Sequence, residues 1–527
     1  MEQEKIEKKH KRIMIYVMII SLICVVGVSY AFFTAGMSSE TSTTVRADAG
    51  TMKITYDGGA NINLAGIYPK DDVWATKTIT VTGNNTTDAE MYYKLTLVVD
   101  SNTFKTDDPL QYELVSTNTS TNGEIIPNIS KKDITGTSIE LGNGHFVKAN
   151  NAKHTYLLKI YYPKKTTSQN ANQGAAFSAH VEITSAKAPK TNGKLSELVL
   201  YNNEVKTPIT APGKEVSTAS EALLASTPDD YGTSYYFRGA VKNNYVEFAN
   251  KCWRIVRVGG DGSVKLILHN DNTAKAANPC NSANNSTTAA FARYSGTTYT
   301  SAFNTNTDDN AYVGFKYGTP GSNKYETTHA NTNNSTILTN LETWYNNNLK
   351  TYESVIDDNV WCNDKTNVTD TTYKPLWADV NGLGLGYGKN VTYYGATKRL
   401  VSTSDSAGGT GPSLKCNGEL SKINSKVGLI TADELAFAGY AYNIRNTVTY
   451  LKENTSGEWW SLSPSDYISI YANVWTVESY GTYFTTGLGG RGGRGVHDSC
   501  GVRPLISLKS TTNVTGNGSS DKPYKVV

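Results

Sequence analysis

The chain has 527 residues, which is too long for one hydrophobic core and predicts about three units at roughly 150 residues per domain. Charged residues make up only 18% of the chain, and the 50 basic and 47 acidic residues leave a net charge of +3. This balance, without a basic stripe, argues against nucleic acid as a partner. The abundant Thr, Asn, Gly and Tyr favour strands and turns, so we expect a mainly β chain with an α+β part.

Residues 1–36 have the pattern of a signal peptide or membrane anchor. The Lys-rich start MEQEKIEKKHKR precedes the apolar run IMIYVMIISLICVVG, and such cations keep the N-terminal end in the cytoplasm. Small residues at Ser29 and Ala31 offer a cleavage site. Counted through Phe33, the apolar stretch reaches about 20 residues, enough for a helix to contact and span the membrane. Cleavage and a retained anchor both stay open. Either way we expect an extracellular, cell-surface or membrane-anchored chain.

Residues 37–188 are predicted to form a β-sandwich of the jelly-roll or immunoglobulin-like kind. Apolar and polar residues alternate in short segments separated by Asn, Gly and Asp turns. Alternation with period two predicts sheets with one wet and one buried face. The predicted strands are 51–56, 78–82, 92–99, 154–162 and 179–183.

Three segments of this region carry a resemblance. They are SYAFFTAG, ADAGTMKITYDG and NLAGIYPKDDVWATKTITVTGNNTTDAEMYYKLTL, and together they resemble the TasA and camelysin family of exported bacterial proteins over about the first 190 residues. The resemblance implies a signal removed by a dedicated signal peptidase. It also implies a jelly-roll domain that can assemble into extracellular fibres by adding strands between subunits.

Residues 189–230 are predicted to be a linker, since Pro recurs among Gly, Ser, Lys and Thr. Within this segment, the capping-box spacing of Thr218 and Glu221 favours one short helix over 218–225. At the other end, residues 510–527 are expected to form a polar C-terminal tail with a final strand-like piece.

Residues 231–509 are predicted to form a second, α+β domain. A hairpin is expected where the turn GGDG joins 253–258 to 264–268. Apolar residues spaced by three and four predict an amphipathic helix over NSTILTNLETWYNNNLKTYESVI. A second helix should start at Thr431, which forms a capping box with Glu434. Further strands are expected at 459–460, 473–478 and 501–508.

This order of elements resembles the C-type-lectin-like fold. The segments YYFRGAVKNNYVEFANKCWRIVRVGGDGSVKLIL, GLITADELAFAG, WWSLSPS, VWTVES and GVRPLISLKS are similar to surface domains of Firmicutes. They are more distantly similar to the formylglycine-generating enzymes and to the variable proteins of diversity-generating retroelements. The resemblance implies ligand contacts between the WW segment and the last strand. The calcium triplets of sugar-binding lectins are absent, because the sequence at 361–364 is WCND and not WND, so we expect no such calcium site.

The stretch from Glu458 to Leu508 has the composition of a recognition surface. Tyr and Arg give large, directional contacts at low entropic cost, and Ser and Gly adapt to a ligand. The expected ligand contacts are Tyr467, Tyr471, Tyr480, Tyr483, Arg491, Arg494 and His497, with Trp253, Trp459, Trp460 and Trp475 as framework. The alternative is a solvated Gly-rich loop whose aromatic side chains pack on their own core.

Cysteines outside the export segment should lie where disulfides persist. These five candidates are Cys252, Cys280, Cys362, Cys416 and Cys500. Two pairs and a spare can be drawn in about fifteen ways, five choices of spare times three pairings. We expect Cys362 to pair with Cys416. The lectin-like resemblance implies Cys252 with Cys500, because the first and last strands of that fold are neighbours. Small buried thiols are the alternative.

No motif indicates catalysis, a metal or a cofactor. The pattern GLGGRG at 487–492 lacks the helix that a dinucleotide site needs. The loop residues His497, Asp498 and Ser499 are adjacent, a placement that seldom forms a triad. The sequence contains no Cys-x-x-Cys, HExxH or GxSxG, and its His residues are scattered. We therefore expect a protein that is not an enzyme, with no cofactor and no metal.

The sequence thus predicts a bacterial cell-surface or extracellular recognition protein. Its loops between Trp459 and Val502 would bind a glycan or protein ligand on another cell or host surface. The N-terminal helix would contact the membrane, and self-assembly is possible in this interpretation. The alternative function is a structural subunit of an extracellular fibre or biofilm matrix that assembles through the N-terminal β-sandwich.

Overall fold

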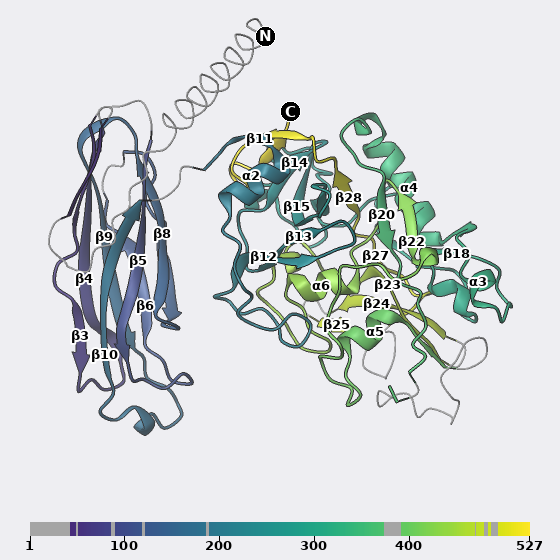
Figure 1. The fold of residues 1–527 in the computed structure, drawn as a ribbon, viewed down its shortest axis with the longest axis horizontal. Coiled ribbons are helices and arrows are strands. Elements are labelled where there is room, and N and C mark those ends of the chain that lie inside the picture. The colour runs from purple at the N-terminus through teal and green to yellow at the C-terminus, as the bar shows by residue number, and fades with distance from the viewer. Residues whose placement is uncertain are drawn as a thin grey trace, which may run out of the picture. The chain divides into compact units, whose positions relative to one another are not determined.

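The computed structural model describes residues 43–48, 51–85, 90–118, 122–185, 189–370, 372–373, 391–468, 471–478, 483–485 and 494–527 (Figure 1). The chain folds as two units, Met1–Ala188 and Pro189–Val527. Both units are built largely from antiparallel sheets, so the prediction of a mainly β chain is confirmed. Among the described residues, no helix has the length and apolar character needed to cross a membrane, and the apolar run at 13–27 lies outside them.

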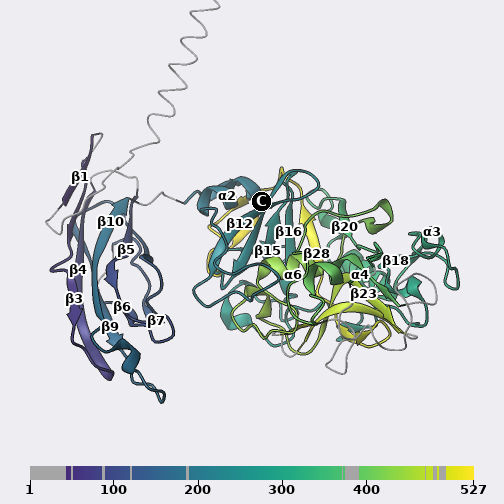
Figure 2. The same ribbon diagram turned by 60° about the horizontal axis from the view of Figure 1, so that its bottom comes forward.

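Two antiparallel sheets make up the first unit (Figure 2). One has the order β1-β2-β4-β9-β6-β7 and the other the order β3-β10-β5-β8. The strands are β1 (Thr43–Asp48), β2 (Thr51–Asp57), β3 (Ile62–Ala65), β4 (Lys70–Asn85), β5 (Met91–Asn102), β6 (Gln111–Ser116), β7 (Ile129–Asp133), β8 (Ser138–Phe146), β9 (Ala149–Tyr162) and β10 (Ala176–Ser185). All five strands predicted here are therefore confirmed, most of them with longer bounds.

The two sheets of the first unit share one hydrophobic core. Buried and partly exposed residues alternate along β5 and along most of β9, as expected for sheets with one wet face. Polar contacts also cross the core: the Tyr56 hydroxyl donates to the carbonyl of Val181 at 2.7 Å, and the Tyr93 hydroxyl lies 2.6 Å from that of Tyr156. The first unit is thus two sheets packed face to face.

The second unit contains a nine-stranded sheet. Its path is β11-β29-β30-β14-β15-β13-β12, with β16 paired to β15 and β28 paired to β16. The strands are β11 (Asn192–Lys194), β12 (Ala222–Pro228), β13 (Thr233–Gly239), β14 (Tyr245–Phe248), β15 (Lys251–Val258), β16 (Val264–Asn270), β28 (Leu505–Leu508), β29 (Asn513–Thr515) and β30 (Tyr524–Val526). The predicted hairpin is β15 and β16, and Gly262 in its turn has a φ of +80°, a conformation that favours glycine.

The sequence interpretation of residues 189–230 as a linker is wrong. This segment contains β11, the helix α2 (Leu195–Asn202) and β12, and both strands pair within the nine-stranded sheet. Of its prolines, only Pro208 and Pro212 lie between α2 and β12, whereas Pro228 is the last residue of β12. The short helix expected over 218–225 is also absent, because β12 begins at Ala222. Similarly, the expected tail 510–527 supplies β29 and β30 to the same sheet.

Two helices of the second unit agree with the sequence prediction. The amphipathic pattern forms α4 (Thr336–Asn348), where the Ser335 side chain accepts a hydrogen bond from the backbone N–H of Leu338. The predicted capping box of Thr431 and Glu434 starts α6 (Ala432–Ala438). Two further helices are α3 (Tyr325–Thr328) and α5 (Gly395–Leu400). The short strands between the helices are β18 (Lys316–Tyr317), β19 (Asn333–Asn334), β20 (Asn359–Cys362) and β22 (Lys422–Ser425).

Two disulfides form in the second unit. Cys362 pairs with Cys416, as expected. Cys252 pairs with Cys280, so the expected Cys252 to Cys500 pair is wrong. The physical reason is that β28 returns beside β16 and not beside β15, while Cys500 belongs to a different sheet, in which it is buried and takes part in neither disulfide.

Candidate functional site

The predicted recognition region is built on a seven-stranded sheet. Its path is β17-β27-β23-β24-β25, with β21 paired to β23 and β26 paired to β24. The strands are β17 (Thr300–Ser301), β21 (Thr392–Tyr393), β23 (Trp459–Ile468), β24 (Tyr471–Glu478), β25 (Tyr483–Thr485), β26 (Arg494–Gly495) and β27 (Cys500–Gly501). Every residue of β23 is buried, and so is every residue of β24 after Tyr471. The sheet is therefore a rigid support for the exposed residues at the ends of its strands.

The tryptophans expected as framework are all fully buried. The indole of Trp460 donates to the carbonyl of Ser301 at 2.8 Å, which joins β23 to β17. The indole of Trp253 donates to the carbonyl of Phe248 at 3.1 Å inside the nine-stranded sheet. Trp253 and Trp460 thus fix the frame by burying area and by donating one directional bond each.

Two of the predicted contact residues lie together at the surface. Tyr471, the first residue of β24, is 43% exposed, and the side chain of His497, just after β26, is 44% exposed. Their rings stack with centroids 6.1 Å apart and planes inclined by 25°. Because β26 pairs with β24, the sheet itself sets this arrangement. The result is a preformed, exposed aromatic pair.

Tyr467 differs from the expectation because it is only 7% exposed. Its hydroxyl donates to the carbonyl of Asp308 at 3.1 Å, so it anchors the neighbouring loop. The same loop accepts a hydrogen bond at Thr307, whose carbonyl lies 2.7 Å from the backbone nitrogen of Ala472. Tyr467 therefore supports the surface that Tyr471 and His497 present.

For the other four predicted contacts, the structure gives either the strand pairing alone or no description. Tyr483 lies in β25 opposite Glu478, and Arg494 lies in β26 opposite Val474. Both therefore flank β24. The predicted contacts Tyr480 and Arg491 lie outside the described residues.

Sequence reasoning missed a buried acid beneath this surface. Asp466 in β23 is fully buried and accepts hydrogen bonds from the side chains of Ser465 and Asn473, the latter at 2.8 Å. Burial raises the pKa of Asp466 to about 6, and the two hydrogen bonds offset only part of this effect. No sequence signal marks it, because a strand buried on both faces shows no alternation.

A second feature is a small cleft that is open to solvent. It lies among β15, β16, β20, the C-terminal end of α5 and the N-terminal end of α6. We call it the charged cleft, after the side chains that line it: Asp229, Arg257, Lys265, Asp364, Arg399, Asp433 and Glu434. These residues are far apart in the sequence, and only the capping-box residue Glu434 could have been singled out beforehand.

Arg399 joins two carboxylates of the charged cleft. Its Nε and Nη2 donate to the two oxygens of Asp433 at 2.7 and 2.8 Å, and its Nη1 donates to Asp364 at 2.7 Å. The guanidinium fork thus meets one carboxylate with two bonds, the strong geometry for this pair. Arg399 fixes the position of both acids.

Glu434 occupies the other side of the charged cleft. Its Oε1 lies 2.8 Å from Lys265 Nζ and 3.0 Å from Arg257 Nε. Burial would raise the pKa of Glu434, but Lys265 and Arg257 outweigh burial and hold the pKa at about 2. The carboxylate is therefore ionised at neutral pH and does not donate a proton. This pairing makes the charged cleft an arrangement of fixed charges.

A metal centre has no support within the described ranges, where no group of three or more His, Cys, Asp or Glu side chains is arranged to hold an ion. No protein-family model matches the chain, and no curated protein matches it. The assignment of function therefore rests on the chain's own geometry.

Proposed function

We propose that the chain is a recognition protein of the cell surface or extracellular space. In this proposal, the loops between Trp459 and Val502 bind a glycan or protein ligand on another cell or host surface. The observation that carries it is the stacked, exposed pair of Tyr471 and His497 at the start of β24, a strand whose other residues are buried. Preorganised aromatic side chains bind at low entropic cost.

The location in this proposal is supported by the cysteines. Two disulfides indicate an extracytoplasmic protein, since thiols in the cytosol are kept reduced. The resemblances of the two units to the TasA and camelysin family and to C-type-lectin-like domains stay predictions. They agree with two packed sheets in the first unit and with mixed helices and sheets in the second.

The test is binding by the full chain and by its Tyr471→Ala/His497→Ala variant. Arrays of glycans and intact bacterial and host cells are the probes. We expect the substitution to reduce binding at least about tenfold, since truncation of a central aromatic contact costs about 2 kcal/mol or more. Tyr352→Ala is the matched control, because Tyr352 is 40% exposed and contacts a single ring, that of Phe248. Equal binding by all three proteins would contradict the proposal.

The second candidate is a fibre subunit that assembles through the first unit. It is favoured by β1, which ends the six-stranded sheet and, among the described strands, pairs with β2 alone. Electron microscopy of the full chain tests it. Fibres that disappear when residues 43–48 are deleted would support this alternative, and a chain that stays monomeric at high concentration would contradict it.

A further inference from the structure

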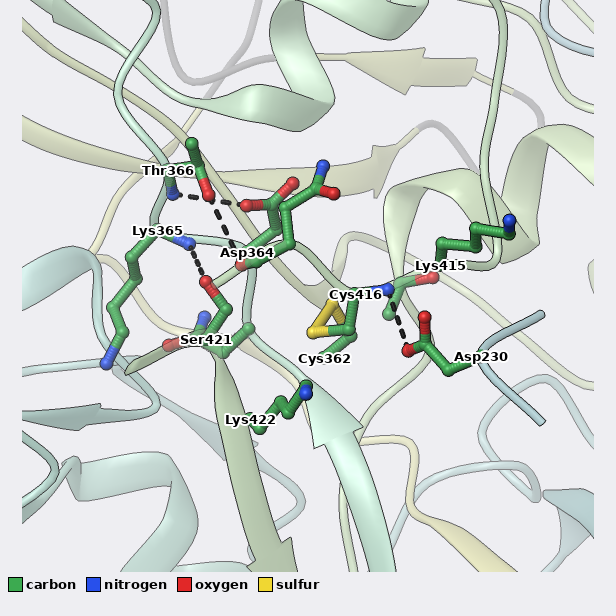
Figure 3. The surroundings of a disulfide bond; sticks show 12 residues. Asp230, Cys362, Asp364, Lys365, Thr366, Lys415, Cys416, Ser421 and Lys422 are labelled. Atoms are coloured by element: carbon green, nitrogen blue, oxygen red, sulfur yellow. Dashed lines mark hydrogen bonds between the residues drawn. A yellow bond between two sulfur atoms is a disulfide. The ribbon is translucent and has the colours of Figure 1, made fainter. Parts of the chain in front are cut away.

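The two disulfides of the second unit have different surroundings. Cys252 and Cys280 are 0% and 2% exposed and pack against Tyr245 in a small buried cluster. Cys362 and Cys416 are half-buried and line the charged cleft (Figure 3). Cys280 also lines a separate small cavity, but Cys362 and Cys416 are the more exposed pair. A thiol from solution therefore reaches the disulfide of Cys362 and Cys416 more easily.

The segment 413–417, which carries Cys416, forms one side of the charged cleft. Its backbone is held by acids of the opposite side: the N–H of Ser413 donates to Asp433 at 2.9 Å, and the N–H of Cys416 donates to Asp230 at 3.0 Å. Figure 3 shows Asp230 beside the disulfide with this second bond. The Thr366 hydroxyl also donates to the carbonyl of Asn417 at 3.3 Å, and Leu414 forms a β-bridge with Asp229. The covalent bond thus acts together with a small set of hydrogen bonds to keep the segment in place.

We propose that Cys362 and Cys416 form a site of thiol–disulfide exchange with a low-molecular-mass thiol, and that their reduction releases the segment 413–417 from the charged cleft. Cys252 and Cys280 form the structural counterpart, which stays oxidised under the same conditions. This inference is independent of the proposed recognition function, because the charged cleft and the loops around Tyr471 are separate features.

The reaction consists of two exchange steps. A thiolate attacks Cys416 Sγ, the bond between the two cysteines breaks, and its electron pair leaves with Cys362 Sγ as a thiolate. A second thiolate then attacks the sulfur that the first small thiol contributed to the mixed disulfide. This releases the oxidised thiol as its own disulfide and leaves Cys416 as a thiolate. Two thiols thus supply the two electrons that reduce the protein disulfide.

Lys422 favours Cys362 as the leaving group. It lies directly opposite Cys362 in the antiparallel pair of β20 and β22, and its ammonium also pairs with Glu419 at 2.7 Å. Figure 3 shows Lys422 beside the disulfide. A nearby cation stabilises a thiolate, and a more stable leaving thiolate is displaced faster. Lys422 thus promotes the exchange by stabilising the thiolate of Cys362.

The first experiment exposes the folded full chain to increasing concentrations of reduced glutathione. Free thiols are then alkylated, and mass spectrometry identifies the labelled peptides. We expect Cys362 and Cys416 to be labelled at least about tenfold faster than Cys252 and Cys280, since access and leaving-group stability both favour them. Equal rates, or faster labelling of Cys252, would overturn the proposal.

A second experiment tests the charge. Lys422→Gln should slow the reduction of the Cys362 to Cys416 disulfide by about threefold or more, because the leaving thiolate loses its cation. Lys350→Gln is the matched control, since Lys350 pairs with Glu353 at 2.9 Å in the same i,i+3 spacing. An effect equal in both variants would remove Lys422 from the proposal.

A third experiment tests the release of the segment. Hydrogen exchange of the peptide 411–418 is measured in the oxidised chain, after selective reduction, and in the Cys362→Ser/Cys416→Ser variant. We expect faster exchange in the last two states, because the N–H groups of Ser413 and Cys416 lose their fixed partners. Unchanged exchange in both states would overturn the release.

Discussion

Both units are rich in strands, but they differ in how much of each strand is covered by neighbouring parts of the protein. In the first unit, strands such as β5 alternate between buried and partly exposed residues, because each sheet has one face in water. In the second unit, β16 and β23 are buried along their whole length. The difference shows that alternation reports one wet face and is lost wherever neighbouring layers cover both faces of a strand.

The burial of ion pairs differs between the two units in the same way. In the first unit, Lys159 pairs with Glu113 where both side chains remain about a quarter exposed. In the second unit, Arg238 pairs with Glu221 where both side chains are completely buried. Burial on both faces forces polar groups in the second unit to find partners inside the protein.

The largest predicted effect comes from breaking that buried pair. Arg238→Met should lower the free energy of unfolding of the second unit by about 3 to 5 kcal/mol, because Glu221 is left as an uncompensated buried charge. Arg238 also donates to the carbonyl of Ala436 in α6. Urea unfolding followed by tryptophan fluorescence measures the effect, since every tryptophan except Trp74 lies in the second unit.

The matched change in the first unit is Lys159→Ala. It should cost less than about 1 kcal/mol, as solvent screens a partly exposed pair. Calorimetry of the full chain measures it. A cost similar to that of Arg238→Met would contradict the proposed difference between the units.

The next effect is a pH dependence at Asp466. Its pKa is about 6 in the folded protein and about 4 in the unfolded chain. The folded state therefore binds the proton more tightly, and stability falls as pH rises from about 4 to about 6 and stays reduced above that range. Asp466→Asn should remove this fall and raise stability at pH 7 by about 1 to 3 kcal/mol.

Asp108 of the first unit should show the opposite sign. Burial would raise its pKa, but hydrogen bonds from Tyr162, Lys165 and Gln169 outweigh burial and lower it. Its contribution to stability is present above its ordinary pKa and is lost as pH falls.

Urea unfolding of wild type and Asp466→Asn between pH 4 and pH 8 tests the predicted fall in stability caused by Asp466. Identical slopes in the two proteins would exclude Asp466 as the titrating group.

The last predicted effect concerns a hydroxyl in β23. The Ser463 side chain accepts a hydrogen bond from the backbone N–H of Ala432, the first residue of α6, at 2.9 Å. Ser463→Ala should cost about 1 to 2 kcal/mol, because a buried donor is left unsatisfied. The partly exposed Thr96 of β5 is the control, and Thr96→Ala should cost about 0.5 kcal/mol or less. Equal costs in urea unfolding would contradict the interpretation.

Local patterns predicted several of the regular elements. Five strands of the first unit, the β15 and β16 hairpin, α4 and the capping box of α6 follow from period, turn glycines and caps. These signals involve residues close in the sequence. The linker prediction failed because a segment of short elements joined by proline-containing turns has the same amino-acid composition as a flexible linker.

The candidate site was predictable only in part. The position of the recognition loops followed from their Tyr and Arg content, yet the exposure of Tyr471 and the burial of Tyr467 in the same hairpin did not. Which of two nearby tyrosines meets solvent depends on the loop at 307–309 packing over one of them. That loop is more than 150 residues away in sequence.

The sequence by itself determined the β-rich class, the main helix and the hairpin, since these follow from composition and local spacing. The tertiary structure alone decided which cysteines bond, that residues 189–230 belong to the nine-stranded sheet, and that charged residues from distant segments meet in one cleft. The reason is that long-range pairing depends on which strands become neighbours, and no local pattern encodes that choice.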